Sequence, residues 1–317
     1  MKPIVVLPFH SQKELFCQEA RKKLLDAGFQ LRCNETGQRP TVEDLKEMLT
    51  GAFAVVAGTE KYPAEVIRAA DELKAVIRFG VGTDNFDLAA MKEKGLEVGV
   101  ITNYNSVAEF ALTLMLSLVK NLPRFDSAVR EGIWARFPMG ELCGKTVGIL
   151  GFGRIGRRLA ELLRGFGVTL LVHDPFLPEE VILAAGAEPV TMAQLLNRSD
   201  ILSLHLPYTP ETYHLINSET IGQMKDGAYL VNTARGALVD EQALLKALTD
   251  GKLRGAALDV YEKEPAQKEN PLFAFPNVVV APHVSALSHE TNYNGSLICA
   301  ESIIRVAKGG KPLYPLW

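Results

Sequence analysis

Short β-branched and apolar runs alternate along the chain with longer stretches of helical character. Because both faces of these runs are apolar, they are typical of strands buried in parallel sheets rather than of half-exposed strands. The alternation predicts an α/β fold. The predicted strands are Ile4–Leu7, Phe53–Ala57, Ala75–Phe79, Thr146–Leu150, Val168–Val172, Ile201–Leu204, Tyr229–Asn232, Ala256–Val260 and Val278–Ala281.

One helix is marked more clearly than the others. The apolar run Phe110–Val119 follows Ser106 and Glu109, which have the spacing of a capping box. Pro123 is expected to stop or kink this helix. A helix this apolar is predicted to be buried, either in the core or in a subunit interface, and we favour the interface. It would also begin a second domain near residue 100.

Composition narrows the class of protein. The chain has 317 residues, of which 47% are hydrophobic and 22% charged, so two folded domains are expected. Its 34 basic and 37 acidic residues give a net charge of −3, which provides no general attraction to nucleic acid or an anionic membrane. No apolar run is long enough for a membrane span, and no secretion signal is recognisable. The cysteines lack CxxC spacing, which indicates a reducing, cytoplasmic setting: Cys17, Cys33, Cys143 and Cys299.

The most informative stretch is a glycine-rich loop. Gly151, Gly153 and Gly156 form GxGxxG between a predicted strand and the helical stretch Arg157–Leu163. Such glycines permit a tight turn, close approach of a pyrophosphate, and close packing of helix on strand. The helix N-terminus would then attract the phosphates. The pattern predicts a dinucleotide site.

An acidic residue after the next strand indicates which dinucleotide binds. Asp174 lies 174 − 151 = 23 residues after the first glycine, near the spacing of a ribose-binding carboxylate. Its charge would repel the 2′-phosphate of NADP, and neither Pro175 nor Phe176 could neutralise that phosphate. NAD is therefore the predicted cofactor. We expect the neighbouring His173 to be structural.

Polar stretches follow the other predicted strands, at the edge where open α/β sheets bind ligands. They contain His205, Pro207 and Thr212; Thr233, Ala234 and Arg235; Asp259 and Glu264; and His283. With the glycine loop and the stretch from Arg78 to Asn85, these motifs cover nearly the whole chain. In this set and order the chain resembles the D-isomer-specific 2-hydroxyacid dehydrogenases, in particular their phosphoglycerate dehydrogenase-like branch.

The resemblance implies a catalytic triad of Arg235, Glu264 and His283. Reduction of a 2-keto acid requires a hydride on the carbonyl carbon and a proton on its oxygen, and an imidazolium is a suitable proton donor. Glu264 would orient the His283 ring and stabilise its charged form. Arg235 would bind the substrate carboxylate and polarise the carbonyl group.

The remaining site residues follow from the resemblance as well. The expected cofactor ligands are Gly151, Gly153, Arg154, Ile155, Gly156, Asp174, His205, Pro207, Thr212, Thr233, Ala234, Asp259 and His283. The expected substrate ligands are Arg78, Val81, Gly82, Arg136, Arg235 and His283. His205 could instead pack at its strand end, and Asp259 is expected near the nicotinamide carboxamide. No metal is expected, because no ligand spacing is present.

The same resemblance predicts the domain arrangement. Residues 101–287 would form a Rossmann-type NAD-binding domain, and residues 1–100 with the returning tail 288–317 a flavodoxin-like substrate domain. A homodimer formed through Phe110–Val119 is expected.

The substrate stays open, because the chain departs from the family pattern. Gly58 stands where another cation for a substrate phosphate is expected, and only Lys61 is nearby to replace it. Candidates are therefore 3-phosphoglycerate, a glyoxylate or hydroxypyruvate reductase reaction, and phosphite oxidation. A further alternative is an NAD-sensing corepressor-like binding protein. The segment Ile101–Asn105 and Leu287 also depart from the family pattern.

Overall fold

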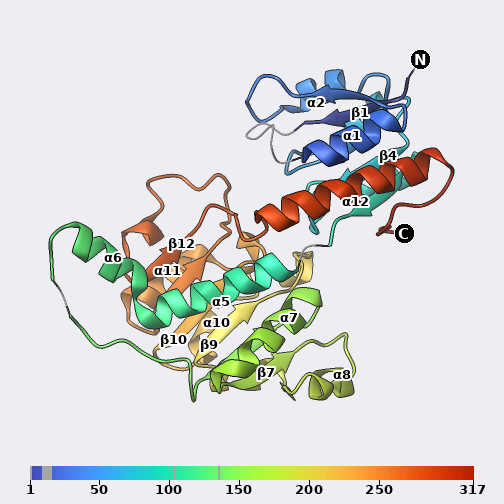
Figure 1. The fold of residues 1–317 in the computed structure, drawn as a ribbon. Helices are drawn as coiled ribbons and strands as arrows, with labels where there is room; N and C mark the ends of the chain where they lie inside the picture. Colours follow the sequence, from blue (N-terminus) through green and yellow to red (C-terminus); the bar gives the residue numbers. More distant parts are fainter. Residues whose placement is uncertain (1, 9–15, 103, 135) are drawn as a thin grey trace. The chain divides into compact units, whose positions relative to one another are not determined.

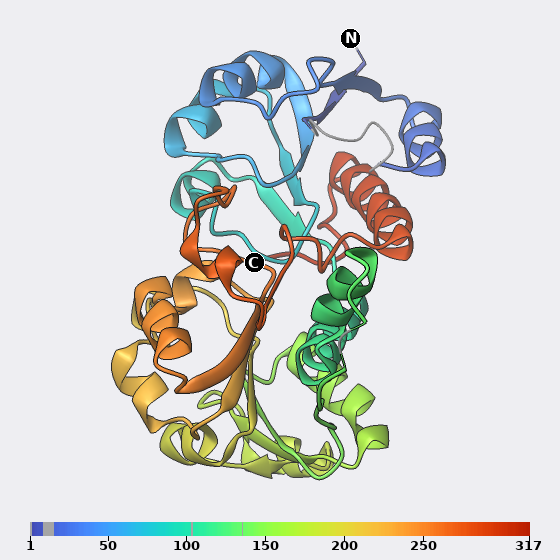
Figure 2. The ribbon, with the colours of Figure 1, turned by 90° about the vertical axis from the view of Figure 1, so that its left-hand side faces the viewer.

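The computed structural model describes residues 2–8, 16–102, 104–134 and 136–317, and it divides the chain into two compact units (Figures 1 and 2). Unit 1 comprises Met1–Asn103 and Leu287–Trp317, and unit 2 comprises Tyr104–Ala286. Each unit is a parallel sheet between helices, so the predicted α/β fold class is confirmed. Among the described residues, none of the helices is both long and apolar enough to span a bilayer.

Unit 1 has a five-stranded sheet in the order β2-β1-β3-β4-β5, the order of flavodoxin-like folds. Its strands are β1 (Ile4–Leu7), β2 (Gln30–Cys33), β3 (Ala52–Ala57), β4 (Ala75–Arg78) and β5 (Glu97–Val100). One core cluster contains α1 (Gln18–Asp26) and the C-terminal α12 (His289–Ala307). The other contains α2 (Val42–Leu49), α3 (Ala64–Ala69) and α4 (Leu88–Glu93). The chain's last helix thus completes the unit in which the chain begins.

Unit 2 has a seven-stranded sheet in the order β12-β11-β10-β9-β6-β7-β8, the doubly wound order of dinucleotide-binding folds with one strand added. The strands are β6 (Thr146–Leu150), β7 (Thr169–His173), β8 (Glu188–Pro189), β9 (Ile201–Leu204), β10 (Ala228–Asn232), β11 (Leu253–Leu258) and β12 (Val278–Val280). The helices are α5 (Asn105–Lys120), α6 (Leu122–Arg130), α7 (Arg154–Leu163), α8 (Glu179–Ala184), α9 (Met192–Arg198), α10 (Ser218–Gln223) and α11 (Glu241–Thr249).

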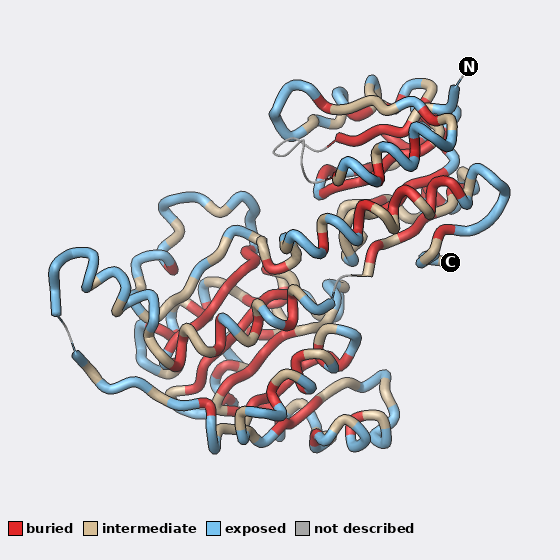
Figure 3. The backbone as a smooth tube through the Cα atoms, in the orientation of Figure 1, coloured by how far each residue is buried: buried red, intermediate tan, exposed pale blue. Residues whose placement is uncertain are grey.

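The strands of unit 2 are apolar on both faces because each face has its own core. Val147 and Ile149 of β6 pack in the cluster that contains α5 and α7, whereas Leu150 packs in the cluster that contains α9, α10 and α11. Figure 3 shows the buried strands inside partly exposed helices. Because all paired strands are parallel, their carboxyl ends share one edge of the sheet, where polar residues can be displayed.

Three strands of the described residues were not predicted from the sequence: β2, β5 and β8. β2 and β8 are edge strands, and β5 is the edge strand on the other side of unit 1. Edge strands are covered on fewer sides, so polar residues are tolerated there, and β8 has only two residues.

The predicted start of helix α5 is wrong. Tyr104 rather than Ser106 is its N-cap residue, and no side chain caps it. The Ser106 hydroxyl instead donates a hydrogen bond to the Ser285 carbonyl at 2.6 Å. The helix ends where Asn121 adopts a left-handed conformation, and Pro123 lies in the first turn of α6, so this proline does not stop α5. One face of α5 lies in the core of unit 2.

Candidate active site

The glycine loop links β6 to α7, which begins at Arg154, three residues earlier than predicted. Gly151 has a φ of +91°, and a Cβ atom there would lie 2.7 Å from the His205 carbonyl oxygen. A Cβ atom on Gly156 would lie 2.4 Å from the Gly151 oxygen, so α7 packs directly on the turn. By contrast, no atom of the described residues lies within 4 Å of a Cβ atom on Gly153. The loop is therefore closed on the protein side and open at Gly153, which fits the approach of a pyrophosphate.

Asp174 fixes the far side of this loop. One of its carboxylate oxygens accepts a hydrogen bond from the Phe152 N–H at 2.8 Å, and the other accepts from the Phe176 N–H at 3.0 Å. The carboxylate thus lies beside the glycine loop, at the end of β7, where a ribose would need it. The neighbouring His173 points elsewhere: its Nδ1 atom lies 2.8 Å from the Val190 carbonyl oxygen. This contact within the protein is consistent with the predicted structural role of His173.

His205 follows β9 and borders the same loop. Its backbone N–H donates to the Leu150 carbonyl at 2.8 Å, and its Nε2 lies 2.8 Å from the Ser203 hydroxyl. Burial of the ring lowers the pKa of His205 to about 4, so the ring is neutral at physiological pH. Pro207 and Thr212 belong to one turn, because the Thr212 hydroxyl donates to the Pro207 carbonyl at 3.0 Å.

The turn after β10 carries Arg235. The buried Asn232 shapes it: its side-chain amide donates to the Arg235 carbonyl at 2.8 Å and accepts from the Ala234 N–H at 3.0 Å. Sequence analysis gave Asn232 no role, although its place at a strand end before the turn was a signal. The hydroxyl of Thr233 is buried, and no described residue of the chain hydrogen-bonds it. A buried hydroxyl in this state fits a ligand that supplies the partner.

His283 and Glu264 form the central pair of the site. The Nδ1 atom of His283 lies 2.7 Å from one carboxylate oxygen of Glu264, and the other oxygen accepts from the Tyr261 N–H at 3.1 Å. Burial raises the pKa of Glu264, but the His283 hydrogen bond and charge, the Tyr261 N–H and Arg235 outweigh burial and lower it below its ordinary value. Glu264 is therefore an ionised acceptor, and Nδ1 is the donor.

The backbone of His283 is held by a second carboxylate. His283 has a φ of +55°, an uncommon conformation for a residue with a side chain. The fully buried Asp259 accepts hydrogen bonds from the N–H groups of Val284 at 2.8 Å and Ser285 at 2.9 Å, and its carbonyl accepts from the His283 N–H at 2.8 Å. Asp259 thus orients the His283 turn, a part that sequence analysis did not find. Its contact with the nicotinamide stays a prediction.

Gly236 brings the arginine turn against the glutamate turn. A Cβ atom at this position would lie 1.9 Å from the Tyr261 carbonyl carbon and 2.5 Å from the Glu262 nitrogen. The two turns therefore touch backbone to backbone. This contact places the segments that carry Arg235 and Glu264 together, and His283 joins them through Glu264.

The predicted substrate ligands of unit 1 lie at the end of β4 and in the loop that follows it. Arg78 donates from Nε to the Gly82 carbonyl at 2.8 Å and from Nη1 to the Phe79 carbonyl at 3.0 Å, so its guanidinium shapes this loop from within. Val81 is 53% exposed at the tip. Arg136 lies in the exposed segment between α6 and β6. The substrate contacts of these residues stay predictions.

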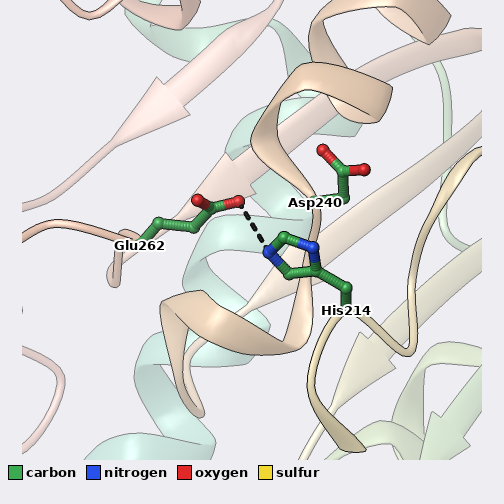
Figure 4. A group of neighbouring side chains, drawn as sticks. All are labelled: His214, Asp240 and Glu262. Carbon is green, nitrogen blue, oxygen red and sulfur yellow. Dashed lines mark ion pairs between the residues drawn. The ribbon is translucent and has the colours of Figure 1, made fainter.

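A cluster of three titratable side chains in unit 2 was not predicted to belong to the site. His214, Asp240 and Glu262 offer ligand atoms that all lie within 4.8 Å of one another (Figure 4). The Nε2 atom of His214 lies 3.1 Å from a carboxylate oxygen of Glu262. Glu262 is two residues before Glu264, so this group adjoins the predicted triad.

Comparison with known proteins identifies the family. Residues 112–285 match the model of the D-isomer specific 2-hydroxyacid dehydrogenase, NAD binding domain, so the cofactor of this unit is NAD. The chain is 42% identical over 275 residues to a D-3-phosphoglycerate dehydrogenase of Methanocaldococcus jannaschii, covering 85% of this chain and 52% of that protein. It is 40% identical over 264 residues to a glyoxylate reductase of Korarchaeum cryptofilum, covering 80% of this chain and 79% of that protein.

Comparison with solved structures supports the same family assignment. The fold matches a glyoxylate reductase from Paecilomyes thermophila with a TM-score of 0.87 and 29% identity, covering 99% of this chain and 98% of that one. A D-lactate dehydrogenase from Escherichia coli matches with a TM-score of 0.83 and 31% identity, covering 99% and 100%. The chain spans about half the length of the phosphoglycerate dehydrogenase relatives that it matches. It belongs to the D-isomer specific 2-hydroxyacid dehydrogenase family.

Proposed function

We propose that the protein is an NAD-dependent oxidoreductase that interconverts a D-2-hydroxy acid and its 2-keto acid. One observation carries this proposal: an ionised carboxylate, Glu264, holds the ring of His283 at 2.7 Å, and Gly236 places the Arg235 turn against the Glu264 turn. A charged imidazole and a guanidinium are the groups needed to protonate a ketone and to bind an adjacent carboxylate.

In the reducing direction, His283 donates the proton from Nε2 to the carbonyl oxygen. Its Nδ1–H remains bonded to Glu264, so the ring keeps its orientation when the proton leaves. In the oxidising direction the neutral ring accepts the hydroxyl proton at Nε2. Asp259 maintains the turn that aims the ring in both directions.

Arg235 binds the substrate carboxylate through its guanidinium, and this contact also draws electron density from the adjacent carbonyl. The N–H groups of Val81 and Gly82 are proposed as a second carboxylate site, since a glycine-containing turn can point successive N–H groups at an anion.

The cofactor supplies the hydride when reduced and accepts it when oxidised. Gly153 and the N-terminus of α7 would bind the pyrophosphate. Asp174 would accept hydrogen bonds from the ribose hydroxyls, and Thr233 would hydrogen-bond a neighbouring polar group of the cofactor. The open space at Gly153 and the buried Thr233 hydroxyl, for which the described residues offer no hydrogen-bond partner, support this assignment.

For the substrate, the loop after β3 favours a small, unphosphorylated 2-keto acid such as glyoxylate or hydroxypyruvate over a phosphorylated one. Gly58 carries no charge, and the space beside it is filled by the buried carboxylate of Glu60, 2.7 Å from the position of a Cβ atom. Burial raises the pKa of Glu60 above its ordinary value, although nearby N–H groups, Arg78 and Arg39 act in the opposite direction. A carboxyl group at this position supplies no positive charge to a substrate phosphate and repels it when ionised.

We also propose a cytoplasmic homodimer. Helix α6 has no buried residue, and the segment around it exposes Leu122, Val129, Trp134 and Met139. Exposed apolar residues of this number on one segment indicate a contact surface. Because the buried face of α5 lies in the core, only the rest of the predicted Phe110–Val119 interface is available to a partner. Sedimentation should give twice the chain mass of 34.7 kDa, and Trp134→Ser should shift it toward the monomer.

A substrate panel tests the activity. D- and L-2-hydroxy acids and 2-keto acids, with and without phosphate, and phosphite are offered with NAD(H) and NADP(H). We expect NADH oxidation with unphosphorylated 2-keto acids, and Arg136→Ala should change the KM only if a second anionic group is bound. Tight NAD binding with no turnover of any compound would favour the corepressor-like reading over the enzyme.

A further inference from the structure

The turn that carries Glu264 is tied to the start of α11 by two reciprocal hydrogen bonds. The Glu262 N–H donates to a carboxylate oxygen of Glu241 at 2.8 Å, and the Glu241 N–H donates to Oε1 of Glu262 at 2.8 Å. The second Glu241 oxygen accepts from the Asn270 side chain at 3.0 Å. Each carboxylate thus accepts a hydrogen bond from the backbone N–H of the other residue, and the two bonds join the Glu264 turn to the start of α11.

His214 closes the same arrangement from a third segment. Its Nε2 lies 3.1 Å from the Glu262 oxygen that accepts from Glu241 (Figure 4). Its backbone N–H donates to the Ala237 carbonyl at 2.8 Å, in the turn that follows Arg235. His214 is held with a φ of +49° and its ring stacks on Tyr213, with ring centroids 3.9 Å apart. This one residue therefore contacts both catalytic turns.

The third member of the group in Figure 4 anchors the helix rather than the turn. Asp240 is the N-cap residue of α11, and its Oδ1 accepts from the N–H groups of Gln242 and Ala243, each at 3.0 Å. Oδ1 of Asp240 and Oε1 of Glu262 thus both accept hydrogen bonds from backbone N–H groups. The helix N-terminus also favours these acidic side chains electrostatically.

We propose that Glu262 and His214 are positioning residues that hold the Glu264 turn against the Arg235 turn and so keep Glu264 bonded to Nδ1 of His283. This inference rests on the proposed function only for its kinetic consequence. Glu262 acts through the backbone of its own turn, and His214 acts through Glu262. Loss of either loosens Glu264 without removing a triad side chain.

The direct test observes the His283 ring in NAD-bound protein. Long-range 1H–15N spectra of protein labelled at histidine report which ring nitrogen carries the proton, and His283→Gln assigns the signal. We expect the wild type to show only the Nδ1-protonated tautomer, because Glu264 accepts from that atom. Glu262→Ala and His214→Gln should give mixed tautomers. Glu262→Gln should restore the wild-type pattern, since its amide oxygen can still accept from the Glu241 N–H.

Kinetics give the second reading. In Glu262→Ala we expect kcat to fall roughly tenfold with an unchanged dissociation constant for NAD, since a misplacement of about 1 Å in a catalytic group costs up to ~100-fold. The matched control is Glu188→Gln, a glutamate of the same unit paired with Arg198 at its surface, which should change neither reading.

Wild-type tautomers in both Glu262→Ala and His214→Gln would overturn the proposal, as would kinetics equal to those of Glu188→Gln. If Glu262→Ala does not fold, His214→Gln decides: mixed His283 tautomers support the proposal, and the wild-type tautomer overturns it. A single His283 tautomer in a wild-type protein that reduces no 2-keto acid would contradict the proposed function while leaving the positioning role intact.

Discussion

Two turns at the carboxyl edge of the same sheet are built in opposite ways. The glycine loop after β6 takes its shape from missing side chains: Gly151 and Gly156 stand where a Cβ atom would meet backbone within 3 Å. The histidine turn after β12 bends a residue that has a side chain into a left-handed conformation and holds it with the distant Asp259.

The difference reflects what each turn must do. A phosphate-binding loop needs open backbone, so glycine serves both shape and function. The proposed catalytic role of the second turn requires the imidazole at a fixed orientation, and hydrogen bonds from elsewhere in the fold offset the conformational cost. The first turn takes its shape from its own glycines, with Asp174 and His205 beside it, whereas the second is held by a carboxylate more than twenty positions earlier in the chain. The two should therefore respond differently to mutation.

Removal of Asp259 should have the largest effect on stability. Asp259→Ala leaves the N–H groups of Val284 and Ser285 without their acceptors in a buried place, which should cost about 3–5 kcal/mol. Asp259→Asn keeps one acceptor and should lose about half of that. Urea unfolding measures both. Equal stability of the three proteins would show that the histidine turn maintains itself.

Next, His205 beside the glycine loop should make stability depend on pH. Its ordinary pKa of 6.5 applies in the unfolded chain, and in the fold it is about 4, so the unfolded state binds the extra proton between these values. Stability should fall by about 3 kcal/mol as the pH drops from 6.5 to 4, and no further from this group below that. His205→Gln should remove this component. His289→Gln, at the exposed start of α12, should retain it.

Two alanine substitutions should sharpen the contrast within the glycine loop. Gly156→Ala pushes α7 away from the Gly151 carbonyl and should cost about 2 kcal/mol of stability as well as NAD affinity. In Gly153→Ala the added methyl group meets no atom within 4 Å in the described part of the chain, so this variant should keep its stability and lose NAD affinity alone. Thermal unfolding with and without NAD separates the two. Equal thermal stability of the unliganded variants would contradict the packing role of Gly156.

The same contrast explains what the sequence could reveal. The GxGxxG spacing and the buried strands are readable because sterics and burial act on neighbouring positions. The strands β2, β5 and β8 were missed because edge positions tolerate polar residues, and the Ser106 capping box was wrong because that hydroxyl bonds to Ser285, far along the chain.

Within the site, the sequence indicated the candidate catalytic residues but not the residues whose hydrogen bonds position them. His283, Glu264 and Arg235 could be placed by resemblance and by the chemistry of ketone reduction. The hydrogen bonds of Asp259 to the His283 turn, and of Glu262 to Glu241, join segments that only the fold brings together. Asn232 at the end of β10 is a similar case, since its role depends on the turn that follows.

The most direct test of the account is to compare cofactor binding and turnover in His283→Ala. NADH affinity, followed by fluorescence, should stay close to that of the wild type, because His283 is only one of many expected cofactor ligands and the glycine loop is unchanged. Turnover of the best 2-keto acid should fall by roughly 10²–10⁴-fold, the range for loss of a general acid. Undiminished turnover in this variant, with NADH still bound, would contradict the assignment of His283 as the proton donor.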